Sequence, residues 1–468
     1  MASLGLSGHP TISSWLASAT SRDVLASQKR DQPNYWTGGV SSLVTQSDLH
    51  SLKFGTGNNI YAGILPRIEE AEHEVVLVTC FWAKSATLDQ LNDALRRLSA
   101  KGVANQREIR VRLCFSSCSL LQKLFHTWSL TGKTYPASTW TKTLGLPRPD
   151  ELQGLDLEIK SIFVLPFSVM HPKFIIIDRK TTFLPSCNVS WEDWFEGCLE
   201  MSGPVVDQCM HFWTSFWASE ADKALPWSSM PSKQSQTIAT PSTKPLANQS
   251  LQATNIPTLF LPSPHHQNPR FRFPWQDPAP APHTPLNTFL LTALARAEKS
   301  IYIQTPNLTS PPVLAALSAA VARNVHVRIL TSERLMLLEQ LVTAGTTTAR
   351  CVNWLIKEYN GMCQKVGDND LEAGTMDFPG AMHISYYMPR LDRRGRDDEP
   401  VQSHLKLTIV DGEIAVFGSG NMDRASWFTS QELGLAFFSR ELVKEVEGSL
   451  KAALEGRTKV VYDSLSER

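Results

Sequence analysis

Two segments of the chain carry histidine, lysine and aspartate at the same spacing. Each has the pattern His-x-Lys-x-x-x-x-Asp, and the residues that define the two copies are His171, Lys173 and Asp178, and His404, Lys406 and Asp411. In an extended strand alternate side chains project from the same side. The histidine and lysine of each copy are therefore expected to face one cleft, while the residue between them packs inward.

This pairing fits attack on a phosphodiester. Such a reaction needs a nucleophile, neutralisation of the phosphate oxygens and a proton for the leaving alkoxide. A neutral imidazole, with a reference pKa of about 6.5, can attack phosphorus, and a second, protonated imidazole can donate to the leaving oxygen. Lys173 and Lys406 would act as point charges on the phosphate. Two copies supply all three needs with no metal and no cofactor.

A short polar segment follows each copy. The first reads Pro185-Ser-Cys-Asn and the second Gly418-Ser-Gly-Asn, and we predict that both present neutral hydrogen-bond donors to the phosphate from Ser186, Asn188, Ser419 and Asn421. Proline fixes φ and lacks an N–H, so the first turn is expected to differ from the second. Activity should survive, because the serine and asparagine are retained.

Carboxylates close each motif, and we expect them to support the histidines. Asp178 and Asp411 lie five residues after the lysines, on the opposite face of a regular strand. A supporting role is predicted for them, through hydrogen bonds to backbone or to an imidazole of the other copy. Glu200 and Glu432 follow the two copies, and either could hold an imidazole in the required tautomer.

The elements that position these residues recur in the same order in both halves. Helical apolar spacing over 59–75 leads into the strand Val75–Thr79, and a second helix over 87–102 precedes a strand over 107–115. The second half repeats this order from 288 to 332. We therefore predict an α/β fold of two similar halves, each with a mainly parallel sheet flanked by helices, packed around a shared cleft.

The predicted boundaries follow from composition. We expect an N-terminal extension over 1–50, a first half over 51–227, a flexible linker over 228–252 and a second half over 253–468. The linker is rich in Ser, Pro, Thr, Gln and Asn and poor in large apolar residues. Forty-five basic and forty-five acidic residues cancel, so net charge favours no polyanion. The eight cysteines lack the spacing of a zinc site.

The paired motif and the Gly-Ser-x-Asn-like turns resemble the phospholipase D superfamily. The resemblance covers about residues 58–438, and the first turn departs from the family pattern by having Pro185 in place of glycine. It implies a metal-independent reaction through a covalent phospho-histidine, in which His171 attacks and His404 protonates the leaving group. Because one chain holds both copies, a monomer suffices for a complete site.

Several functions remain open at this stage. The preferred one is hydrolysis or phosphatidyl transfer on a phospholipid, favoured by the resemblance, the neutral net charge and the aromatic content, with peripheral membrane contact as a corollary. The alternatives are a nuclease or nucleic-acid end-processing phosphodiesterase, and a protein that binds phosphate esters without turnover. The absence of a clean apolar N-terminal stretch favours a cytoplasmic location, with a mitochondrial presequence as the alternative.

Overall fold

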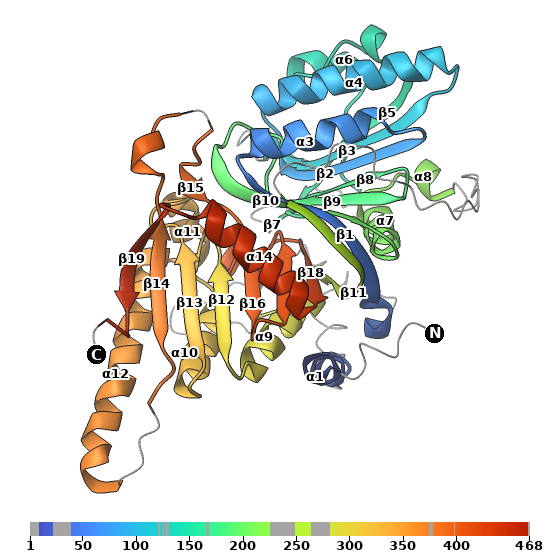
Figure 1. Cartoon of the computed structure of the whole chain (residues 1–468). Coiled ribbons are helices and arrows are strands. Elements are labelled where there is room, and N and C mark those ends of the chain that lie inside the picture. Colours follow the sequence, from blue (N-terminus) through green and yellow to red (C-terminus); the bar gives the residue numbers. More distant parts are fainter. Residues whose placement is uncertain are drawn as a thin grey trace.

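The structure is a computed structural model of the whole chain. It describes residues 9–21, 39–119, 122–123, 126, 131–164, 168–224, 249–263, 281–373, 378–396 and 398–466. Figure 1 shows two α/β lobes joined through long strands at the middle of the molecule. All but two of the named strands belong to a single 17-stranded sheet, so the predicted halves share one sheet.

Two antiparallel strands, β1 (Val44–Gly55) and β11 (Gln249–Ser263), form the centre of this sheet. Outward from β1 the order is β10 (Trp194–Ser202), β9 (Thr181–Pro185), β8 (Phe174–Ile177), β2 (Glu74–Phe81), β3 (Ile109–Ser117) and β5 (Leu155–Ser161). Outward from β11 it is β18 (Glu432–Phe438), β17 (Ile414–Gly418), β16 (Leu407–Val410), β12 (Ser300–Gln304), β13 (His326–Thr331) and β14 (Met382–Tyr387). Each half therefore adds its strands in the same order, as the repeat predicts.

The α/β class is confirmed, but the prediction of mainly parallel sheets is wrong. Parallel pairing is confined to β2–β3–β5 in the first half and β12–β13–β14 in the second. The strands that follow each motif return through tight hairpins, β8 to β9 and β16 to β17, which force antiparallel pairing. Two short strands complete the sheet edges, β4 (Lys133–Thr134) beside β5 and β19 (Thr458–Asp463) beside β14.

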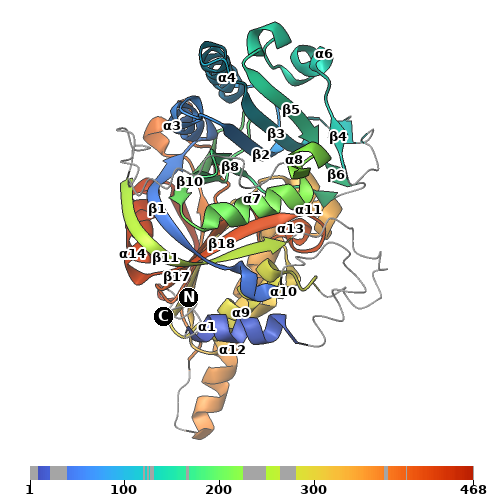
Figure 2. The same ribbon diagram turned by 90° about the vertical axis from the view of Figure 1, so that its right-hand side faces the viewer.

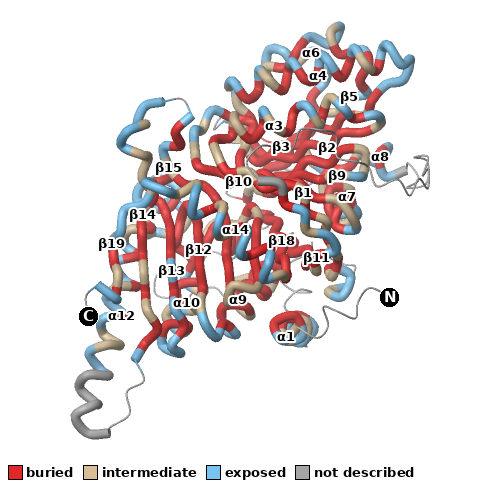
Figure 3. The backbone as a smooth tube through the Cα atoms, viewed as in Figure 1, coloured by how far each residue is buried: buried red, intermediate tan, exposed pale blue. Residues whose placement is uncertain are grey.

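Helices cover the sheet where their apolar faces match it. In the first half these are α3 (Gly57–Glu69), α4 (Ala86–Ala104) and α7 (Val205–Phe216), and in the second α9 (Pro285–Arg296), α10 (Pro311–Ala322), α12 (Thr348–Ala373) and α14 (Arg440–Ala453). Hydroxyl caps start several of them, such as Ser85, which accepts from Leu88 N at 3.2 Å. Figure 3 shows the strands buried beneath the exposed outer sides of the helices. No helix in the described ranges has the length and apolar content needed to cross a bilayer.

The predicted boundaries need two corrections. The boundary at residue 50 falls inside β1, which is central to the sheet. The linker prediction lies outside the described residues up to 248, and its last four residues belong to β11. Within the N-terminal segment, α1 (Pro10–Ala19) packs on α9 of the second half (Figure 2), where Trp15 Nε1 donates to Thr288 Oγ1 at 3.2 Å.

Candidate active site

The two motifs meet because each pairs with the other half of the chain. The His-x-Lys segments lie immediately before β8 and β16 rather than inside them. His171 N donates to Gln431 O at 2.9 Å, just before β18, and His404 N donates to Phe195 O at 2.9 Å, in β10. The crossing is reciprocal, so the site forms at the junction of the halves.

Each histidine is held by a glutamate from the opposite half. His171 Nδ1 lies 2.9 Å from Glu432 Oε2, and His404 Nδ1 lies 2.7 Å from Glu196 Oε1. Both glutamates are buried, with little water to compete for their oxygens. The carboxylates therefore fix Nδ1 as the protonated nitrogen and leave Nε2 as the basic one.

The prediction for Glu432 agrees with this geometry, but the prediction for Glu200 is wrong. Glu200 accepts from Ser51 Oγ at 2.9 Å and lies 3.5 Å from Arg67 Nε, away from either imidazole. Strand register pairs Pro185 with Cys198, and Gly418 with Gly434, so the counterpart of Glu432 is Glu196. Sequence reasoning missed Glu196 because two glutamates lie on the same side of one strand and only the register separates them.

The two lysines are placed differently. Lys173 Nζ donates to the backbone oxygen of His171 at 3.0 Å. Lys406 Nζ donates to His404 O and lies 3.0 Å from Nε2 and 2.8 Å from Nδ1 of the same ring. Since Nδ1–H faces Glu196, the ring nitrogen that can accept from the Lys406 ammonium is Nε2.

Access to the two imidazoles also differs. The side chain of His171 is 13% exposed, and none of the described residues hydrogen-bonds its Nε2. The side chain of His404 is 3% exposed, and the ring of Trp194 lies over it with 4.5 Å between centroids. His171 is therefore open to a ligand, whereas His404 is covered by Trp194 and Lys406.

Burial and charge set the protonation of these groups. Burial lowers the pKa of His171, opposed by the charge of Glu432 and reinforced by those of Lys173 and Lys406. Burial likewise lowers the pKa of His404 to about 3 and that of Lys406 to about 7. Burial opposes ionisation of Glu196, but the hydrogen bond from His404 and the charge of Lys406 outweigh it and lower its pKa to about 2. Neutral imidazoles thus face ionised carboxylates at neutral pH.

The serines support the glutamates, which corrects the role predicted for them. Ser186 Oγ donates to Glu196 and accepts from Gly197 N at 2.9 Å. Ser419 Oγ donates to Glu432 and accepts from Leu433 N at 3.0 Å. Each hydroxyl proton is thus used on a carboxylate and is not available to a phosphate.

The turn at Pro185 does not differ in its main hydrogen bond. Ser186 N donates to Gly197 O at 2.8 Å, and Ser419 N donates to Leu433 O at 2.9 Å. Proline is tolerated because its missing N–H is not needed at this end of β9. Gly418, in contrast, cannot be replaced without strain, since a Cβ there would lie 2.4 Å from Leu433 O.

The asparagines are oriented by neighbours within their own halves. Asn188 Oδ1 accepts from Phe81 N at 3.1 Å, which turns its amide N–H groups away from β2. Asn421 Nδ2 donates to Asp423 Oδ2 at 3.0 Å. Phosphate binding by Asn188 and Asn421 stays a prediction.

The motif aspartates bind backbone, in agreement with the first of the two roles predicted. Asp178 accepts from the amides of Glu72, His73 and Glu74 at 2.7–2.9 Å. Asp411 accepts from Lys299 N at 2.7 Å and Ser300 N at 2.9 Å. Both aspartates have positive φ, 51° and 56°, so they end their strands and fix the start of β2 and β12.

Across the described ranges, no group of three or more His, Cys, Asp or Glu side chains is arranged to hold a metal ion.

Comparisons with known proteins find similarity in sequence for part of the chain and in fold for most of it. Residues 290–454 match the family described as cardiolipin synthase, PLD-like domain. The fold is similar to that of phosphatidylserine synthase from Haemophilus influenzae, with a TM-score of 0.52, 13% identity, and 88% of this chain and 89% of that chain covered. The phospholipase D family member Nuc from Salmonella typhimurium is matched at 20% identity over 38% of this chain and 90% of its own, with a TM-score of 0.25. No curated protein matches the sequence.

The second motif thus lies within a segment that matches a PLD-like family model, and the chain as a whole is similar in fold to a phosphatidylserine synthase.

Proposed function

We propose that this protein cleaves phosphodiesters of phospholipids, by hydrolysis or phosphatidyl transfer, through a phospho-histidine intermediate. The reciprocal pairing of His171 with Glu432 and His404 with Glu196 is the observation that carries this proposal. A pair of imidazoles, each with Nδ1 fixed by a carboxylate, provides one nucleophile and one proton carrier. Lys173 and Lys406 add positive charge for the phosphate oxygens.

His171 is assigned as the nucleophile because it is neutral and its Nε2 is open. In the first step Nε2 attacks phosphorus, a P–N bond forms, and the P–O bond to the leaving group breaks. Nε2 of His404 first receives a proton from the Lys406 ammonium, which lies 3.0 Å away, and the resulting imidazolium gives this proton to the leaving alkoxide. A bound anionic phosphate favours the protonated forms of His404 and Lys406, since opposite charge raises the pKa of a base.

In the second step water or an alcohol attacks the same phosphorus. His404 takes the proton of the attacking hydroxyl, the P–N bond breaks, and neutral His171 is regenerated. Water yields a phosphomonoester, and an alcohol yields a new phosphodiester. Hydrolysis and transfer therefore differ only in the acceptor.

A lipid substrate is supported by apolar side chains near the site. The short helix α11 (Leu337–Ala344) packs on α13 (Arg424–Phe428), which begins three residues after Asn421. Its outer face exposes Leu338 (76%) and Val342 (58%), with Leu341 between them also exposed. Exposed aliphatic residues on a helix beside the site fit contact with acyl chains at a membrane surface. A groove for a nucleic-acid backbone would favour basic residues there.

Turnover of a panel of phosphodiesters would test the proposal. Phosphatidylcholine, phosphatidylglycerol and short single-stranded DNA would be incubated with the protein, each with and without EDTA and ethanol. We expect EDTA-resistant lipid turnover, with ethanol captured as phosphatidylethanol. Nucleotide release without lipid turnover would move the protein to the nuclease alternative.

A variant separates an enzyme from a binding protein. His171→Asn should abolish turnover and trap no phosphorylated peptide in mass spectrometry, while His211→Asn, a change on the exposed side of α7, should leave turnover unchanged. Phosphate-ester binding that persists in a wild-type chain with no turnover on any substrate would favour the binding-protein alternative. A chain with both motifs should be active as a monomer, which size-exclusion chromatography with an activity assay can check.

A further inference from the structure

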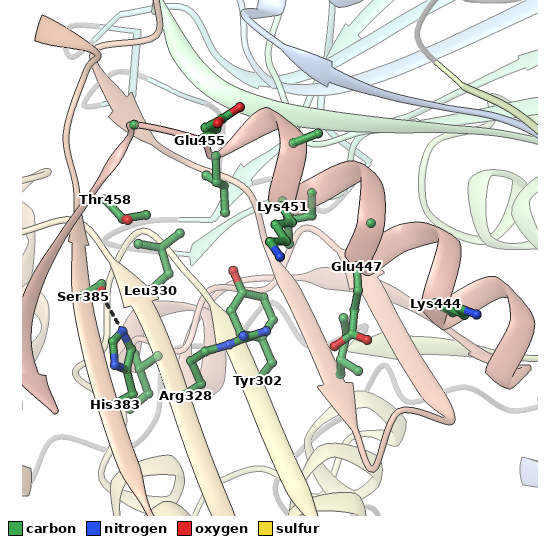
Figure 4. Close-up of a pocket in the computed structure, with 17 residues that line it drawn as sticks. Tyr302, Arg328, Leu330, His383, Ser385, Lys444, Glu447, Lys451, Glu455 and Thr458 are labelled. Atoms are coloured by element: carbon green, nitrogen blue, oxygen red, sulfur yellow. Dashed lines mark hydrogen bonds between the residues drawn. The ribbon is translucent and has the colours of Figure 1, made fainter. Parts of the chain in front are cut away.

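A second cavity lies on the outer side of the second half, separate from the paired histidines. It has a volume of about 890 Å³, within the usual range for small-molecule sites, and lies between α14 and the face of β12, β13, β14 and β16 (Figure 4). None of the four motif histidines and lysines lines it. The proposed reaction makes no use of this pocket.

The lining combines positive charge with an apolar floor. Arg328 from β13 and Lys444 and Lys451 from α14 line the pocket, and Figure 4 shows Lys451 pointing from α14 toward the side where Tyr302 lies. Apolar surface comes from Leu330, Ile409, Leu450 and Leu454. Two carboxylates, Glu447 and Glu455, also line it, so three fixed positive charges face two negative ones.

Arg328 is held in place at this pocket by a ring and not by a carboxylate. Its guanidinium lies over the Tyr302 ring at 4.7 Å from the centroid, which holds it against the sheet. The side chain is exposed, and no carboxylate of a described residue forms an ion pair with it. A planar guanidinium held in place and left unpaired suits a carboxylate or phosphate group.

The first half shows what this position accepts. Register pairs Val76 with Arg112 on β2 and β3, and Tyr302 with Arg328 on β12 and β13, so Arg112 is the counterpart of Arg328. Arg112 is buried and binds a carboxylate from the chain itself, that of Asp222, at 2.8–3.1 Å. Asp156 adds a contact at 3.0 Å.

Among the described residues of the second half, no carboxylate forms such an ion pair with Arg328. Asp222 belongs to the short helix α8 (Glu220–Ala224), whereas the chain after α14 continues into strand β19, whose Thr458 lines the pocket. The second half therefore does not repeat the element that supplies the carboxylate to Arg112. The space left beside Arg328 is open to an external ligand.

We propose that this pocket is a binding site for an organic anion, with its carboxylate or phosphate group on Arg328 and Lys451 and its apolar body along Leu330 and Ile409. In the first half, the carboxylate of Asp222 makes the same kind of contact with Arg112. The site is distinct from the paired histidines, and its occupancy does not depend on the proposed reaction.

Equilibrium dialysis of the full chain with dodecanoate and dodecyl phosphate would test this proposal. We expect one saturable site per chain for at least one of these probes. Dodecanol and inorganic phosphate serve as controls, because they carry only the apolar chain or only the charged group. Tighter binding of dodecyl phosphate than of dodecanoate would identify a phosphate as the ligand group. The reverse order would identify a carboxylate. Saturable binding of neither probe would overturn the proposal.

Three variants locate the site. Arg328→Met should weaken binding about tenfold or more, as expected for loss of a charge-assisted contact, while Arg350→Met, an exposed change outside the pocket, should leave it unchanged. Thr458→Asp should add a negative charge to the lining of the pocket and also weaken binding of an anion. Undiminished binding by both Arg328→Met and Thr458→Asp would show that the probe binds elsewhere.

Discussion

The two halves carry the same motif but expose it differently. His171 has 13% of its side chain exposed, whereas His404 has 3% and lies beneath Trp194. The paired backbone contacts, His404 to Phe195 and His171 to Gln431, make Ser430 the counterpart of Trp194. Residues outside the motif therefore separate an open histidine from a covered one, and a motif match alone would treat them as equivalent.

Exchange of the buried glutamates is expected to have the largest effect. Glu432→Gln or Glu196→Gln replaces the carboxylate that fixes an imidazole, and we expect turnover to fall by roughly 10²–10⁴, as for other carboxylate-oriented histidines. Glu200→Gln is the matched control, since Glu200 lies on the same strand as Glu196 but contacts Ser51 and Arg67. Steady-state kinetics with thermal melting would check these variants. Equal losses for Glu196 and Glu200 would refute the assignment.

Arg112 and Arg328 are counterparts in the two halves, so their contributions to the free energy of unfolding can be compared. Asp222→Ala should lower the free energy of unfolding by about 3 kcal/mol, because it leaves Arg112 buried with only the half-exposed Asp156 as partner. Arg328→Met should change it by less than about 0.5 kcal/mol, because Arg328 is exposed and unpaired. Denaturant unfolding of both variants would measure the difference. A similar loss of unfolding free energy in the two variants would mean that the two arginines contribute equally to stability.

Turnover should also depend on pH, because Lys406 lies beside the covered imidazole of His404. Burial lowers the pKa of Lys406 to about 7, so the free protein loses this charge as pH rises through 7. We expect kcat/KM for an anionic substrate to fall on the alkaline side near this pH. Lys406→Arg should keep the charge and move the fall to higher pH, although at a lower maximum, because guanidinium is not isosteric with ammonium. An unchanged alkaline limb in Lys406→Arg would assign the titration to another group.

The smallest effect on turnover is expected from Trp194→Ser, which gives the first half the same residue type as Ser430 in the second. Trp194→Ser removes the ring over His404 and should raise the rate at which diethyl pyrocarbonate modifies His404. Turnover should change by less than about tenfold, because the ring forms no hydrogen bond with the motif. Peptide mass spectrometry can compare this rate with that of His171 in the same sample. An unaltered rate at His404 would show that Lys406, and not Trp194, limits access.

The sequence predicted the parts of the site that depend on local spacing. The two His-Lys pairs and the backbone role of Asp178 and Asp411 follow from positions that are close together along the chain. Glu196, the role of Ser186 and Ser419, and the antiparallel pairing could not be predicted in this way, because they depend on how strands from distant parts of the chain align. The difference between Trp194 and Ser430 becomes meaningful only once that alignment is known.

The reciprocal contacts between the halves have the character of an isologous interface, in which one patch is used twice about a two-fold axis. In a symmetric dimer of identical chains, any substitution at such an interface changes both copies at once. Here the two patches are separate stretches of one chain, so Trp194 can differ from its counterpart Ser430 with no effect on that counterpart. A single covalent chain thus allows the two chemically equivalent positions of the site to be adjusted independently.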